Sequence, residues 1–189
     1  QDKNFHGDGS FSPSSKMFSN VGILGDEILV NGTHSPYFES STNLVRFRVL
    51  NASNARIYNF GFDDERKFHL IATDSGLLEA PLELNELMLS PGERAEIVVE
   101  VSPGESTILQ SKDPDLEAPF WGERYNGGDD AFDVMEIRAK EELTNMPDLP
   151  GQLATIQWPD EEKVVETRSI ELNGYDRING KEMDMSRID

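Results

Sequence analysis

The most informative stretch of this 189-residue sequence is Val45-Arg46-Phe47-Arg48-Val49-Leu50-Asn51-Ala52-Ser53-Asn54-Ala55-Arg56. Apolar side chains occupy every second position from Val45 to Val49, and arginines stand between them. Alternation with a period of two predicts a β-strand over Leu44 to Leu50 with one buried face. The polar run that begins at Asn51 predicts a turn, and a further strand is expected from Arg56 to Phe62.

The segment from Arg94 to Val101 repeats this pattern and is the clearest strand in the chain. We expect the two alternating segments to supply the core, because their apolar residues would share one face of a sheet. The residues expected to face the core are Val45, Phe47, Val49, Ala95, Ile97, Val99 and Val101, with Glu96 and Glu100 in water.

Other short apolar runs recur between turn signals such as Asn31-Gly32 and Pro91-Gly92. They predict further strands over Glu27–Val30, Lys67–Thr73, Glu86–Leu89, Ser106–Gln110 and Phe132–Arg138. About eight strands in all indicate an all-β sandwich or barrel. Little helix is expected, with helical turns considered only at Glu83 to Met88 and Asp115 to Trp121.

The character of the sequence changes after Arg138. We expect a segment leaving a preceding domain over 1–20, one sandwich domain over 21–139, a connector over 140–177 and the start of a following domain over 178–189. The connector holds three prolines and little periodicity, although Arg168 to Leu172 is a candidate strand. Apolar residues in the tail predict either mobility or self-association when no neighbouring domain covers them.

Composition excludes several functions. The formal net charge of −19 argues against nucleic-acid binding and against binding to anionic membranes, because both need a cationic face. The chain has no cysteine, so disulfides, thiolate nucleophiles and metal sites that need a thiolate ligand are excluded. No run of 18 apolar residues exists, and no membrane span is expected. The first residues include neither an initiator Met nor a signal sequence, which is typical of a piece of a longer protein.

No motif in the chain carries an active site by itself. The three histidines, His6, His34 and His69, are too scattered to predict a shared metal site, and His69 reads as a packing residue in a strand. The run from Asp2 to Asp8 starts like a calcium loop but lacks the glutamate at its twelfth place, so a polar turn is favoured. Asn31-Gly32-Thr33 and Asn51-Ala52-Ser53 are formal glycosylation sequons that turn chemistry also explains.

Six groups of residues, taken in their order along the chain, give a more specific indication of fold and function. They are Gln1–Phe5 with Asp8-Gly9, Gly25–Gly32 with Pro36, Val45–Arg56, Ile71–Leu78, Leu89–Glu96, and Ile178–Lys181 with Asp184-Met185 and Arg187–Asp189. Together they resemble the second, middle domain of three-domain multicopper oxidases, the family of bacterial laccases, cuprous oxidases and spore-coat laccases. The resemblance covers essentially the whole chain. Ser75 departs from the family pattern, which often has glycine there, but the departure affects only a turn.

The resemblance implies a cupredoxin-like Greek-key β-sandwich with an extended C-terminal connector. In the family, copper is bound by histidines and a cysteine of the first and third domains. A chain with three scattered histidines and no cysteine is therefore expected to hold no copper ligand and no catalytic residue. Copper would belong to the parent protein, and the partners of this chain would be the flanking cupredoxin domains.

The resemblance also implies a wall of the parent's substrate cavity. The matching positions are Gly22, Ile23 and Leu24, and the loop from Asp113 to Trp121, in which Phe120 and Trp121 would suit an aromatic substrate. The alternative is that both aromatic side chains pack beneath their own loop.

Two functions from different classes remain open, and an adhesion module is less favoured. The first is a non-catalytic scaffold in an oxidase that takes single electrons from phenolic or metal-ion substrates and reduces O₂ to water. The second is a domain of a copper-free relative that serves as a structural or division-associated binding protein. The family implies a bacterial parent outside the cytoplasm, in the periplasm or cell envelope.

Overall fold

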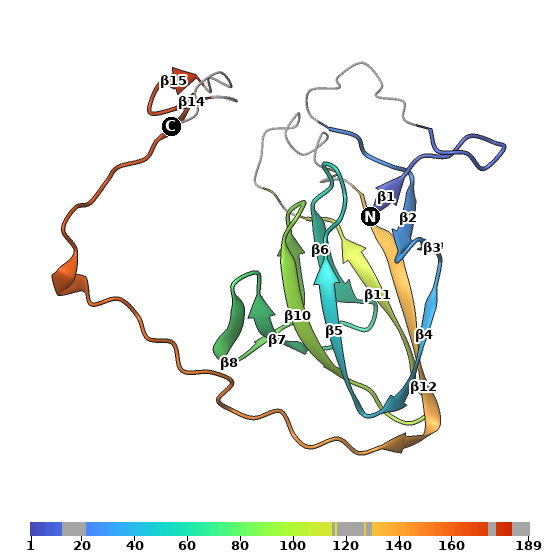
Figure 1. Cartoon of the computed structure of the whole chain (residues 1–189). Helices are drawn as coiled ribbons and strands as arrows, with labels where there is room; N and C mark the ends of the chain where they lie inside the picture. Colours follow the sequence, from blue (N-terminus) through green and yellow to red (C-terminus); the bar gives the residue numbers. More distant parts are fainter. Residues whose placement is uncertain (13–21, 115, 117–126, 128–129, 174–176, 183–189) are drawn as a thin grey trace. The chain divides into compact units, whose positions relative to one another are not determined.

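The computed structural model describes residues 1–12, 22–114, 116, 127, 130–173 and 177–182 (Figure 1). Within these ranges the regular structure is almost entirely β, which confirms the expected all-β class. The chain divides into two compact units, Gln1–Thr155 and Ile156–Asp189. The described residues include no helix long and apolar enough to cross a membrane.

The first unit is a sandwich of two main sheets. The four-stranded sheet has the order β5-β10-β7-β8, formed by Leu44–Leu50, Arg94–Glu100, Phe68–Thr73 and Gly76–Leu84. The five-stranded sheet has the order β4-β12-β11-β6-β9, formed by Tyr37–Thr42, Phe132–Thr144, Ser106–Lys112, Tyr58–Phe62 and Glu86–Leu89. All neighbours are antiparallel except β12 and β4, which are parallel.

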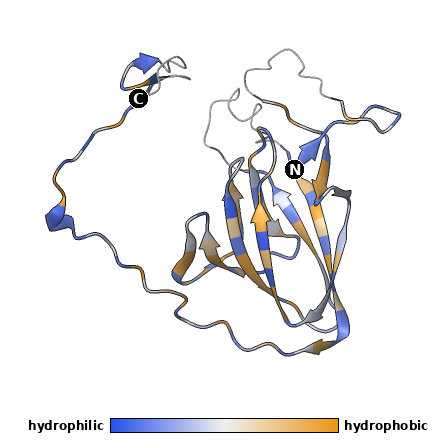
Figure 2. Ribbon diagram, in the orientation of Figure 1, coloured by the Kyte–Doolittle hydropathy of each residue, from blue (hydrophilic) through white to orange (hydrophobic). Residues whose placement is uncertain are grey.

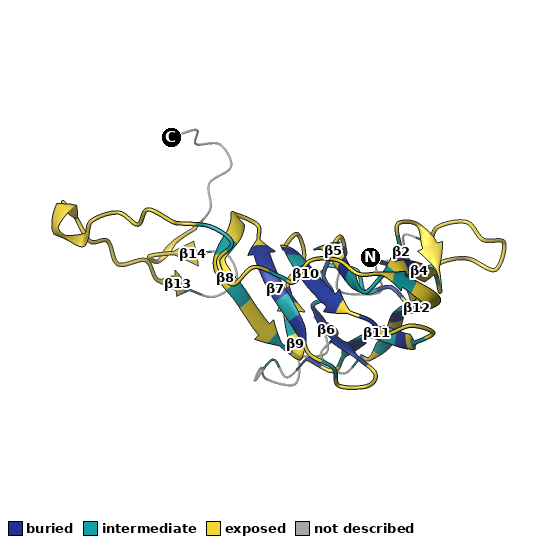
Figure 3. Ribbon diagram, turned by 90° about the horizontal axis from the view of Figure 1, so that it is seen from below, coloured by how far each residue is buried: buried dark blue, intermediate teal, exposed yellow. Residues whose placement is uncertain are grey.

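The core lies between these sheets, as the alternation predicted. In the antiparallel β5–β10 pair, Val45 lies opposite Val99, Phe47 opposite Ile97, and Val49 opposite Ala95. Apolar and hydrophilic residues alternate along these strands in Figure 2, and Figure 3 shows the buried interior of the sheets. From the other sheet, Tyr58, Phe60, Phe62, Leu109, Val134 and Ile137 complete the core.

The structure corrects several sequence-based expectations. Glu83 to Met88 forms no helical turn: it contains the end of β8 and most of β9, which pair with β7 and β6. Strand β12 continues to Thr144 rather than ending at Arg138, because its extension pairs with β4. The alternative helical turn at Asp115 to Trp121 falls almost wholly outside the described residues.

A smaller sheet of three short strands precedes the sandwich. Strands β1 (Asp2–Lys3), β2 (Glu27–Val30) and β3 (Thr33–His34) are antiparallel, and Asn31 and Gly32 form the β2–β3 turn. Asn31 and Gly32 both have positive φ, at 51° and 82°, which is the backbone that a tight hairpin requires.

The second unit has little buried surface of its own. It contains the 3₁₀ turn η2 (Glu161–Lys163) and the short antiparallel strands β13 (Leu172–Asn173), β14 (Arg177–Ile178) and β15 (Lys181–Glu182). Asn179 and Gly180, both with positive φ, form the tight turn between β14 and β15. Several apolar side chains are largely exposed, among them Trp158, Val165, Ile170, Leu172 and Ile178. Mobility or self-association of this unit remains a prediction.

Candidate functional site

The turn that follows β5 is organised by the buried side chain of Asn51. Its amide Nδ2 donates hydrogen bonds to the backbone oxygens of Arg56, at 2.8 Å, and Leu89, at 2.9 Å. Its Oδ1 accepts from the backbone nitrogen of Ser53 at 3.0 Å. Because the amide is enclosed and both of its donated bonds are used inside the protein, the turn interpretation of this sequon is the one the structure supports.

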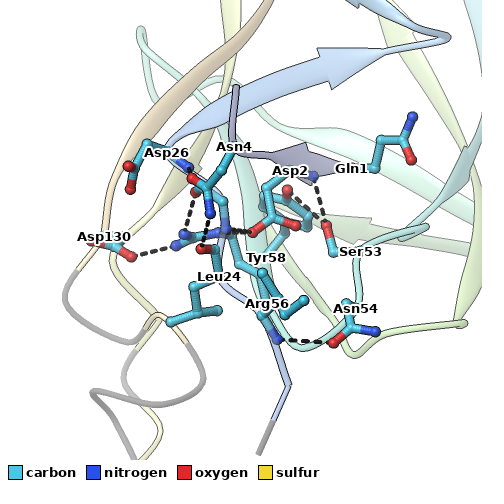
Figure 4. Close-up of polar contacts among 12 residues, drawn as sticks. Gln1, Asp2, Asn4, Leu24, Asp26, Ser53, Asn54, Arg56, Tyr58 and Asp130 are labelled. Carbon is cyan, nitrogen blue, oxygen red and sulfur yellow. Dashed lines mark hydrogen bonds and ion pairs between the residues drawn. The ribbon is translucent and has the colours of Figure 1, made fainter. Parts of the chain in front are cut away.

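This turn aims Arg56 into the protein, where it joins three separate segments of the chain (Figure 4). Its Nε donates to Asp2 Oδ2 at 3.0 Å, and its Nη2 donates to the backbone oxygen of Gly25 at 2.8 Å. Its Nη1 forms an ion pair with Asp130. The guanidinium also lies 4.6 Å from the centroid of the Phe132 ring. We call Asp2, Gly25, Arg56 and Asp130 the Arg56 cluster.

The charges of the cluster are enclosed to different degrees. The side chains of Arg56 and Asp2 are 3% and 0% exposed, whereas that of Asp130 is 43% exposed. Burial opposes the charge on Arg56, but the hydrogen bonds to Asp130 and Asp2 outweigh it, so the pKa of the guanidinium is raised. Asp2 Oδ2 also accepts from the Gly25 backbone nitrogen at 2.6 Å. The cluster is therefore a clamp with one enclosed ion pair, Arg56–Asp2, and removing Arg56 would leave the Asp2 carboxylate uncompensated.

A second polar chain extends from the clamp into the core. The Asp2 backbone nitrogen donates to Ser53 Oγ at 3.1 Å, and Ser53 Oγ lies 3.0 Å from the Tyr58 hydroxyl. Burial raises the pKa of Tyr58 to about 12. A phenol with such a pKa is a poor proton donor near neutral pH, which favours a structural role over acid–base catalysis.

This burial predicts a late step in the alkaline titration. Of the four tyrosines in the chain, Tyr58 should ionise near pH 12 rather than near its ordinary value of 10.0. Phenolate absorbance measured against pH should therefore show one late step, and Tyr58→Phe should remove it. Because the raised pKa stabilises the folded state below about pH 10 and this contribution is lost between pH 10 and 12, Tyr58→Phe should also flatten the decline of stability there. A late step that survives in Tyr58→Phe would contradict the assignment.

The structure places three of the predicted wall residues beside this turn. Gly22, Ile23 and Leu24 are half-buried, and the Ile23 backbone nitrogen donates to Asn54 Oδ1 at 2.9 Å. Gly22 has φ of +96°, and a Cβ at this position would lie 2.5 Å from the Cβ of Ala55. Only glycine fits this backbone and this close approach.

The other predicted wall residues belong to the loop that follows β11. Asp113 is exposed and lies directly after β11, before the buried Pro114. Phe120 and Trp121 lie outside the described residues. The end of this loop contacts Arg56 through Asp130, whose carboxylate forms the ion pair. The Asp130 backbone nitrogen also donates to the backbone oxygen of Gly127 at 3.2 Å. Gly127 has φ of +74°, and a Cβ there would lie 2.5 Å from Arg56 Nη1.

The donors in this chain do not fit the copper centres of the resembled family. His34 pairs with Glu27 at 2.8 Å on the β2–β3 hairpin, His69 lies on β7 opposite Glu83, and His6 is in the N-terminal turn. Among the residues that the structure describes, no three histidine or carboxylate side chains gather closely enough to hold a metal ion. The sequence also offers no thiolate.

The Arg56 cluster was not predicted from the sequence, although Asp2 and Arg56 each belong to a motif described above. Asp2 begins the run that starts like a calcium loop, but its carboxylate pairs with Arg56 across 54 positions of the chain. Asp8, the last acidic residue of that run, accepts from the Ser10 backbone at 2.9 Å, as expected of a polar turn. The available signal is one charged residue, Arg56, at the start of a mostly apolar segment, since a charged side chain is rarely buried without a partner.

Comparison with known proteins gives consistent similarities. The multicopper oxidase family model matches residues 14–110. The cell division protein FtsP of Edwardsiella tarda is 41% identical over 180 residues, which cover 90% of this chain and 37% of that protein. FtsP of Escherichia coli K12 is 34% identical over 174 residues, covering 89% of this chain and 36% of that protein. The chain thus spans less than half the length of these relatives.

Solved structures show the same architecture. A laccase from Pediococcus acidilactici covers the whole chain at 29% identity with a TM-score of 0.77, and the match covers 38% of that laccase. The multicopper oxidase McoA from Aquifex aeolicus matches 96% of this chain at 30% identity with a TM-score of 0.79, over 39% of its own length. These likenesses confirm the cupredoxin-like β-sandwich.

Proposed function

The chain belongs to the multicopper oxidase family, and we propose that it serves there as a non-catalytic middle domain that holds its neighbours at a fixed spacing. The proposal rests on two observations. The sequence has no cysteine and only three scattered histidines that could bind copper, and the N-terminal segment is held to the sandwich by the Asp2–Arg56 ion pair. Residues 156–189 would lead into the following domain.

The Arg56 cluster is the observation that carries this proposal. The first residues resemble the segment that leaves the preceding domain, and Asp2 in that segment is held by a fully enclosed ion pair with the sandwich. The backbone on both sides of Asp2 is also fixed, because β1 pairs with β2 and the Gln1 backbone oxygen accepts from Leu29 at 2.7 Å. A domain attached to this segment would have little freedom to swing relative to the sandwich.

For the parent protein, we favour a division-associated binding protein over an oxidase. The identity of 41% to a protein named for cell division exceeds the 29–30% identity to the laccase and McoA structures. The oxidase remains the second candidate, because those oxidases share the fold over nearly the whole chain. In that case Gly22 to Leu24 and the loop from Asp113 would form part of the substrate wall. Either parent would act in the periplasm or cell envelope.

A distance measurement between spin labels tests the spacer role. One label would be attached in the preceding domain of the full-length parent and the other at Lys140→Cys on β12, since this chain has no cysteine of its own. We expect a narrow distance distribution that broadens in Asp2→Asn, because the ion pair to Arg56 is lost. Asp8→Asn is the matched control and should leave the distribution narrow, since Asp8 bonds only within its own turn. An equally narrow distribution in Asp2→Asn would contradict the proposal.

A further inference from the structure

Strand β5 is an edge strand with one face that is charged and one that is apolar. It pairs with β10 along one side, and in the described part of the chain no strand pairs with its other side. An open edge of this kind presents backbone donors and acceptors to any extended chain that approaches it. Nothing in the proposed spacer role uses this edge.

Two hollows flank β5, one on each side of its sheet. The inner hollow, of about 460 Å³, is lined by the apolar face of β5 and by apolar residues of β2 and β4, including Phe47, Val49, Val30 and Phe38. The outer hollow, of about 490 Å³, is lined by three arginines and two carboxylates, Arg46, Arg48, Arg94, Asp74 and Glu96, together with Leu50 and Leu77. A strand added to this edge would therefore place successive side chains alternately in an apolar and in a charged environment.

The charged side has an excess of cations. Arg46 Nε and Arg48 Nε both donate to the same carboxylate, that of Glu96, at 2.6 and 3.0 Å. The side chains of Arg46 and Arg48 are 55% and 82% exposed, whereas that of Glu96 is only 15% exposed. The hydrogen bond from Arg46, with the charge of both arginines, lowers the pKa of Glu96, so it is ionised and balances one of the two guanidiniums. In a chain with a net charge of −19, this is a locally cationic edge.

We propose that the free edge of β5 binds an extended segment of a partner protein in which apolar and acidic residues alternate. The apolar residues would enter the inner hollow, and the acidic residues would lie across from Arg46 and Arg48. Opposite charges on neighbouring strands stabilise their pairing and like charges oppose it, so the arginines disfavour pairing with the β5 edge of a second copy. The inference stands on this surface alone and holds whether or not the parent binds copper.

The test uses the isotope-labelled 189-residue chain and three synthetic peptides observed by NMR. The first is acetyl-Thr-Val-Glu-Val-Glu-Val-Thr-amide, the second has lysine in place of both glutamates, and the third has the composition of the first in the order Thr-Glu-Glu-Val-Val-Val-Thr. We expect saturable binding of the first peptide, with added exchange protection at alternate amides of Leu44 to Leu50. Binding of the lysine or reordered peptide with equal affinity would overturn the proposal.

Matched variants complete the test. The double variant Arg46→Glu/Arg48→Glu should weaken binding of the acidic peptide about tenfold or more, since it sets like charges opposite each other. Arg138→Glu/Lys140→Glu makes the same change of charge on β12, in the other main sheet, and should leave the affinity unchanged. Arg48→Ala, at a largely exposed side chain, gives a milder variant if the double variant does not fold. Equal binding by all variants would overturn the proposal, as would self-association of the chain that the β5 variants abolish, because the occupant would then be a second copy.

Discussion

Replacing Arg56 by methionine is expected to lower the free energy of unfolding by about 3–5 kcal/mol, the usual cost of removing one partner of a buried ion pair. Asp2 would keep its bond from the Gly25 backbone but would lose the guanidinium that pairs with its fully enclosed carboxylate. Its Oδ1 already lacks a hydrogen-bond partner within those residues. For a chain of this size the melting temperature should fall by roughly 6–20 °C, measured by circular dichroism.

Two further variants distinguish the effect of leaving the buried Asp2 carboxylate unpaired from the effect of losing an arginine side chain. Arg138→Met removes an arginine that is half exposed, pairs with Glu136 and lies 4.2 Å from the Tyr37 ring centroid, and it should melt close to the unmodified chain. Asp2→Asn combined with Arg56→Met should recover part of the lost stability, because the fully enclosed carboxylate at position 2 is then gone and the carboxylate left at Asp130 is 43% exposed. If Arg56→Met melted no lower than Arg138→Met, the clamp would have no energetic importance.

Val99→Asp tests the core and should unfold the chain or cost several kcal/mol. Val99 is 0% exposed and lies opposite Val45 in the β5–β10 pair, so the new carboxylate would have no partner and no water. Val165→Asp makes the same substitution at a side chain that is 100% exposed and should leave denaturant unfolding unchanged. Equal midpoints for the two variants would show that the inward face has been assigned wrongly.

The strands that are easiest to predict from the sequence are those with one face in the core and the other face in water. The predicted ends of β5 and β10 agree with the structure to within one residue, because each strand has one face in the core and the other in water. Strand β8 was missed because Leu77, Leu78, Pro81 and Leu82 do not alternate. Pro81 is compatible with a strand only because β8 lies at the edge of its sheet, a position that the sequence does not show.

The site was harder to predict than the fold. The backbone turn at Asn51 is local and was recognised, but the pairing of Arg56 with Asp2 and Asp130 joins segments 54 and 74 residues away. Neither the alternation of apolar residues nor the position of turn residues indicates contacts between segments so far apart in the sequence. The same limit applied to β4, a largely polar strand that exists because β12 pairs with it in parallel.

Metal analysis of the isolated 189-residue chain tests the non-catalytic assignment most directly. The chain would be dialysed against Cu(II), freed of loosely bound metal and assayed for copper and for visible absorbance, with the full-length parent treated in parallel. We predict no stoichiometric copper and no blue band in the chain, since it has no cysteine and its three histidines lie on separate elements. Weak surface binding at His6 or His34 is compatible with this result. One tightly held copper per chain with a strong blue absorbance would contradict the account.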